Sequence, residues 1–111
     1  MMNISAKKAT NALVVKVSGQ MDAATALDFE KSISEFIAQG EKAFVINLSG
    51  LEFISSVGLR SILASAKRLK EKNGKLIFSE LHGHVKEVFA ISGFQGIFKI
   101  GDSDEECLRR I

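Results

Sequence analysis

Residues 43–48, AFVINL, lead through residues 49–55, SGLEFIS, into SVGLRSILASAKRL at residues 56–69. The first six residues are almost continuously apolar, which is typical of a strand covered on both faces in a parallel sheet. We interpret Phe53 and Ile54 as part of a short connection. The apolar residues after Ser56 recur at helical spacing, at Leu59, Ile62, Leu63, Ala66 and Leu69. Strand, loop and helix therefore form the unit that decides the fold class.

Two strands and a helix are expected before this unit. Apolar and polar residues alternate from Met2 to Ala6 and again over residues 13–18, with a turn at residues 8–11, which predicts a hairpin. Gly19 and Gln20 interrupt the alternation. From Asp22 the apolar spacing becomes helical, at Ala26, Phe29, Ile33, Phe36 and Ile37, and Gly40 ends that helix.

The remainder of the chain repeats the alternation of strand and helix. Asn73 and Gly74 end the long helix, and a strand is expected at residues 75–79, a short helix before Gly93, and a strand at residues 97–100. Ser103 and Glu106 have the spacing of a capping box, which predicts a final helix. The expected fold is α/β, with a mixed, mostly parallel sheet of about five strands, about four helices and one antiparallel edge.

Length and composition favour one ordinary globular domain. The chain has 111 residues, of which 46% are hydrophobic and 25% charged, so we expect a single domain over residues 1–111 and a monomer. The 15 basic and 13 acidic residues are scattered, which argues against nucleic acid or a membrane as partner. We interpret the basic stretch at residues 67–75 as a solvated helix face.

Targeting signals and disulfide chemistry are not indicated. Residues 1–10 lack an apolar core of the signal-peptide kind, and no apolar run approaches the roughly 20 residues that a membrane helix needs. Cys107 is the only cysteine, so the chain cannot form an intrachain disulfide. We expect a soluble cytoplasmic protein.

The candidate functional residues lie where the central strand leads into the long helix. Ser55, Ser56 and Gly58 stand at the N-terminus of that helix. The first backbone N–H groups of a helix lack intrahelical partners and the helix dipole is positive there, so a serine can cap the helix and a phosphoryl group on it would be stabilised. Both serines could equally serve as caps alone, and Gly58 could serve packing alone.

The order of motifs resembles the anti-sigma factor antagonist branch of the STAS family. Similar segments are Gly19-Gln20-Met21-Asp22, then Ile46-Asn47-Leu48, then Ser55-Ser56-Val57-Gly58-Leu59, and finally Ile91-Ser92-Gly93-Phe94. These segments are spread over essentially the whole chain. The resemblance therefore implies a single STAS domain that works as a binding protein and not as an enzyme.

The resemblance also implies particular roles and partners. Ser56 matches the phosphorylated serine of the family, Gly58 and Leu59 match the Gly-Leu that follows it, and Asp22 and Asn47 match polar residues near that serine. The implied partner is an anti-sigma factor that is also a serine kinase and is bound by the unphosphorylated form, which regulates transcription through partner switching. A serine phosphatase would reset the phosphoserine.

Two residues depart from the family pattern. Ser55 stands where aspartate is usual and Val57 where a second small residue is usual, so Ser55 is the alternative phosphate acceptor. Arg60 follows closely and could pair with the phosphate, which would lengthen the life of the modified form. We expect the partner to contact the start of the helix, including Arg60, Ser61 and Lys67.

Other functional classes are less well supported by the residues. An esterase elbow would need glycine at position 54, where this chain has isoleucine. His82 and His84 lack a convincing third ligand for a metal, and no phosphate-binding glycine loop indicates a nucleotide cofactor, so we expect neither metal nor cofactor. The remaining alternative is a STAS subunit without phosphorylation, in a lipid-handling ABC transporter or another signalling assembly.

Overall fold

The computed structural model describes residues 1–111 and contains five strands, four α-helices and one short 3-10 helix. The elements in chain order are β1 (Met2–Lys8), β2 (Leu13–Met21), α1 (Ala26–Ala38), β3 (Ala43–Ile54), α2 (Ser56–Glu71), β4 (Lys75–Ser79), α3 (Gly83–Ile91), η1 (Phe94–Gly96), β5 (Lys99–Gly101) and α4 (Asp104–Arg110). None of the helices is both long and apolar enough to cross a lipid bilayer.

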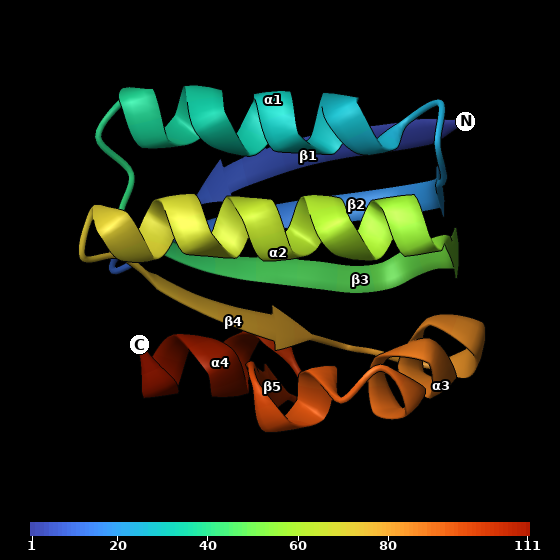
Figure 1. Ribbon diagram of the computed structural model, residues 1–111. Helices are drawn as coiled ribbons and strands as arrows, with labels where there is room; N and C mark the ends of the chain where they lie inside the picture. Colours follow the sequence, from blue (N-terminus) through green and yellow to red (C-terminus); the bar gives the residue numbers. More distant parts are fainter.

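The five strands form one sheet in the order β1-β2-β3-β4-β5. β1 runs antiparallel to β2, and the other three pairings are parallel. Figure 1 shows α1 and α2 lying side by side across one face of the sheet, with α3 beyond the end of β4 and below the last part of β3 in this view. This arrangement confirms the predicted α/β fold with a mixed, mostly parallel sheet and an antiparallel edge.

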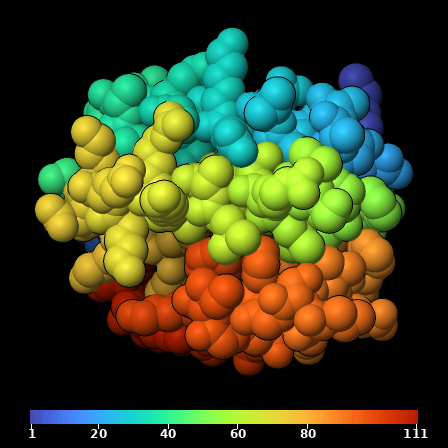
Figure 2. Space-filling view, viewed as in Figure 1, coloured from blue at the N-terminus to red at the C-terminus, as the bar shows by residue number.

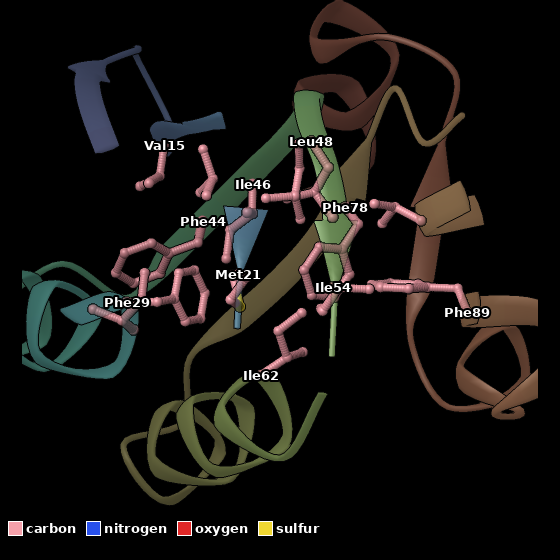
Figure 3. Close-up of a cluster of buried hydrophobic side chains, with 14 of the residues drawn as sticks. Val15, Met21, Phe29, Phe44, Ile46, Leu48, Ile54, Ile62, Phe78 and Phe89 are labelled. Carbon is pink, nitrogen blue, oxygen red and sulfur yellow. The ribbon is translucent and has the colours of Figure 1, made fainter. Parts of the chain in front are cut away.

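The main hydrophobic core lies between the sheet and the helices α1, α2 and α3. Phe44, Ile46 and Phe78 from the strands meet Phe29 of α1 and Ile62 of α2, and all five are almost completely buried. The labelled side chains in Figure 3 converge between these elements. Burial of each such side chain contributes about 1.5–3 kcal/mol to the free energy of folding, so the contacts of this core hold α2 against the sheet.

A smaller core lies on the opposite face of the sheet, beneath α4. Val45 and Ile77 alternate with the residues of the main core, so they point to the other face, where they contact Cys107 of α4. The Cys107 thiol lies close to the Phe78 carbonyl. Burial raises the pKa of this thiol, which therefore stays protonated and acts as an apolar packing group.

Several predicted boundaries were wrong at the carboxyl ends of the strands. β2 continues to Met21 and β3 continues to Ile54, although residues 19–20 and 53–54 were predicted to lie outside strands. The two strands remain paired through register shifts, with Gly19 opposite Leu51, and Gly19 takes a φ of 95°. The bulges disturb the alternation of side chains while the backbone pairing persists.

Two further elements, α1 and β5, are shorter than predicted. Asp22 lies in a turn and α1 begins only at Ala26, while β5 covers Lys99–Gly101 instead of residues 97–100. Ile97 follows the short helix η1 and is 62% exposed. The apolar residue that suggested a strand is therefore a surface residue.

Candidate functional site

The candidate site lies at the carboxyl ends of β2 and β3, where α2 begins. The Ser55 N–H donates to the Met21 carbonyl at 2.9 Å, which joins the start of α2 to the end of β2. Gly58 is buried so closely that a Cβ atom there would lie 2.8 Å from the Met21 oxygen and from Ile54. The close approach requires glycine and holds the first turn of α2 against the sheet.

Ser55 and Ser56 play different structural parts. Ser55 is the N-cap of α2, with an extended backbone and a hydroxyl that accepts from the Gly58 N–H at 3.1 Å. Ser56 is the first residue of the helix, and its side chain is exposed. The cap therefore occupies one serine hydroxyl and leaves the other directed to solvent at the positive end of the helix dipole.

Asp22 lies next to this helix start because it follows Met21 directly. Its carboxylate accepts from the Ala24 N–H at 2.9 Å and from the Thr25 N–H at 3.1 Å. The bond from Ala24, supported by Thr25, lowers the pKa of Asp22 below its ordinary value. Asp22 is therefore ionised at neutral pH and also shapes the turn that enters α1.

The other residues of the first two turns of α2 divide by exposure. Val57 and Leu59 are half-buried and pack against the main core, while Arg60 is exposed. Arg60 follows Ser56 by four residues, so the two side chains lie on the same face of α2. Ser61, which we expected on the contact surface, is only 2% exposed and is corrected to a core position.

Asn47 does not lie near Ser56. It stands seven residues before the end of β3, which corresponds to on the order of 20 Å of strand. Its buried amide donates to Asp104 at 2.9 Å and to Glu80 at 3.0 Å, on the face of the sheet that α4 covers. The side chain joins β3 to the start of α4, because its position in the pleat directs it away from α2.

An aromatic pair that the sequence did not indicate stands beside the helix start. Phe53, at the end of β3, is 40% exposed and stacks on His84 of α3, with ring centroids 5.2 Å apart and planes 4° apart. The neighbouring His82 ring lies 2.5 Å from the Ser49 carbonyl. His82 and His84 thus connect the start of α3 to β3. The only sequence feature that could have indicated this pair is Phe53 itself, an aromatic residue three positions before the candidate phosphate acceptor Ser56.

The comparisons with known proteins agree with this architecture. The family model described as the STAS domain matches residues 3–107. BtrV of Bordetella bronchiseptica, whose name describes an anti-sigma factor antagonist, is 38% identical over 104 residues, which cover 94% of this chain and 90% of BtrV.

Solved structures show the same fold. An anti-sigma factor antagonist from Mycobacterium paratuberculosis is 26% identical with a TM-score of 0.88, covering 100% of this chain and 94% of that chain. The phosphorylated form of the Bacillus cell fate determinant SpoIIAA is 23% identical with a TM-score of 0.73, covering 97% of this chain and 98% of that chain. The likeness to SpoIIAA shows a common fold.

Proposed function

Because the chain belongs to the STAS domain family, we propose that it is an anti-sigma factor antagonist controlled by phosphorylation of Ser56. In its unphosphorylated form it binds an anti-sigma factor that is also a serine kinase, and it thereby regulates transcription. Phosphorylation releases the partner, and a serine phosphatase restores the binding form. The protein acts in the cytoplasm as a monomeric binding protein without a catalytic function or a cofactor.

The observation that carries this proposal is that Ser55 and Ser56 have different structural roles. The Ser55 hydroxyl caps α2, whereas the Ser56 side chain is exposed at the first helical position. A kinase can reach Ser56 without disturbing the cap. The 38% identity to BtrV over most of both chains supports the class of function.

A phosphate on Ser56 would act on the partner and not on the fold. It adds about 1.5 to 2 negative charges at a helix N-terminus, where the dipole and free N–H groups favour an anion. At the centre of a protein interface the same charges would be desolvated without a counter-charge from the partner, and an incompletely compensated buried charge costs several kcal/mol. Phosphorylation would thus weaken binding while the domain stays folded.

The partner surface is the region around the start of α2. It combines the exposed residues Ser56 and Arg60 with the stacked pair Phe53 and His84, and the turn at Asp22 borders it. Phenylalanine and arginine side chains are enriched in protein interfaces relative to the rest of the protein surface. The aromatic pair would supply apolar contact area beside the switchable hydroxyl.

Arg60 would set the lifetime of the phosphorylated form. It lies one turn beyond Ser56 and forms no salt bridge within the chain, so its guanidinium is available to the phosphate. We expect Arg60→Ala to speed dephosphorylation several-fold, and Lys72→Ala, at the exposed C-cap of α2, to leave the rate unchanged. Equal rates for Arg60→Ala and wild type would argue against the ion pair.

The proposal is tested by mapping the phosphate. The chain is incubated with ATP and a cognate serine kinase, and intact mass and fragment mass spectra are recorded for wild type, Ser56→Ala and Ser55→Asn. We expect one phosphate that is lost only in Ser56→Ala. Asparagine at position 55 keeps the N-cap and removes the hydroxyl, so this variant is a matched control without a weakened helix.

The alternative outcomes have distinct meanings. A phosphate lost only in Ser55→Asn would move the acceptor to Ser55. No phosphate on any variant with an active kinase would favour the STAS subunit without phosphorylation, as in a lipid-handling transporter or another assembly.

A further inference from the structure

A groove lies far from Ser56, beside the second half of α2. β5 pairs with β4 only from Ile77 to Ser79, so the outer edge of β4 is unpaired at Lys75 and Leu76. The groove occupies this open edge, between α2, the segment that leads into β5, and the end of α4. In Figure 2 it appears as the hollow between the yellow part of α2 and the red C-terminal segment.

The groove has an apolar lining and a volume of about 540 Å³. Leu76 and Phe98 are partly buried in it, and Leu63 and Ile97 are 39% and 62% exposed. Small-molecule sites have volumes of roughly 300–1,000 Å³ and mostly apolar linings with a few polar groups. The groove is of that size.

The rim of the groove is basic. Lys67 and Lys70 come from α2, Lys75 from β4, Lys99 from β5 and Arg110 from α4, and none of the lining residues is acidic. The four lysines form no salt bridge within the chain, whereas Arg110 lies 3.5 Å from Glu106. The four lysine charges outweigh the partial negative charges at the C-terminal ends of α2 and α4, both of which face the groove.

We propose that this groove binds an amphipathic anion, a small molecule with a carboxylate or phosphate head group and a hydrocarbon chain. The apolar lining would cover the chain, and the unpaired lysines would hold the head group. The proposal is independent of the function of Ser56, which lies at the opposite end of α2.

Binding is tested by recording amide NMR spectra of the full chain during titration with decanoate or decyl phosphate. We expect saturable shifts at Gly74, Lys75 and Ile97, with weaker or no binding of decanol and decyltrimethylammonium, which share the chain but lack the negative head group. A response to only one of the two anions would support the proposal and show which head group the groove prefers.

Charge reversal provides the matched variants. Lys75→Glu combined with Lys99→Glu should weaken decanoate binding about tenfold or more, since two attractions become repulsions. Lys31→Glu, an exposed lysine of α1 outside the groove, should bind as wild type does. The absence of saturable shifts with both anions, equal binding of decanol, or an unchanged affinity in the double variant would overturn the proposal.

Discussion

α2 and α4 are both preceded by an N-cap serine whose hydroxyl accepts a hydrogen bond from the backbone N–H three residues later. Ser55 accepts from Gly58 and Ser103 accepts from Glu106, both at 3.1 Å, and both serines have an extended backbone. The residues that follow differ. Ser56 is exposed, whereas the Asp104 carboxylate accepts from the buried side chains of Asn47 and Ser79.

The charged residues at the N-termini of the two helices also differ. The first turn of α4 contains Asp104, Glu105 and Glu106, while the first turn of α2 contains no acidic residue. The dipole of α4 is therefore already compensated by residues of its own first turn, and that of α2 is not. The same capping arrangement therefore has two uses. In α4 the first residue binds the helix to buried side chains of the sheet, and we call this contact the anchor of α4. In α2 the first residue is exposed and can accept an added anion.

The largest expected effect is on partner binding at α2. Ser56→Asp should weaken the affinity for the cognate anti-sigma factor by about 2–5 kcal/mol, because a carboxylate would be desolvated in the interface without a counter-charge from the partner. Ser56→Ala should bind as tightly as the unphosphorylated wild type. Isothermal titration calorimetry measures both affinities, and wild-type affinity in Ser56→Asp would refute the switch.

The next effect concerns the anchor in α4. Asp104→Ala should lower the free energy of unfolding by about 2–3 kcal/mol, because it removes an acceptor from the buried Asn47 amide and the buried Ser79 hydroxyl. Glu105→Ala, an exposed neighbour in the same turn, should cost well under 1 kcal/mol. Urea denaturation compares the two, and similar losses would mean that the buried hydrogen bonds contribute little.

The two caps themselves should be equivalent. Ser55→Ala and Ser103→Ala should each reduce the free energy of unfolding by about 1 kcal/mol, since each leaves one N–H group of a helix without its partner. Denaturation of the two variants side by side measures the difference. A much larger loss at either serine would show that its hydroxyl does more than cap the helix.

Local patterns predicted most of the fold. The strand at residues 75–79 was predicted with the bounds that β4 has, and the predicted capping box gave the start of α4, with Ser103 as the N-cap. Both are local features, a short apolar run and a four-residue motif. The ends of β2 and β3 were missed because bulges shift the register there, and a register shift depends on the partner strand.

The site was predictable only in part for the same reason. The position of Ser56 at a helix start follows from its own neighbours in the sequence. The roles of Asn47 and Phe53 depend on α4 and α3, which lie far along the chain. The basic groove combines residues 67–75, interpreted as a solvated helix face, with Lys99 and Arg110, and only the folded chain brings these together.

The smallest expected effect sharpens the comparison of the two helix ends. Phosphorylation of Ser56 should leave the free energy of unfolding unchanged or raise it by about 0.3–1 kcal/mol, because the added anion compensates a helix dipole that no acidic residue in the first turn of α2 compensates. Glu105→Gln should lower the stability by a similar amount, because it removes an anion from the first turn of α4. Urea denaturation at low ionic strength measures both changes, and added salt should diminish both. A large loss of stability on phosphorylation would mean that the phosphate disturbs the packing of α2. Partner release would then follow from local unfolding instead of from charge at an intact surface.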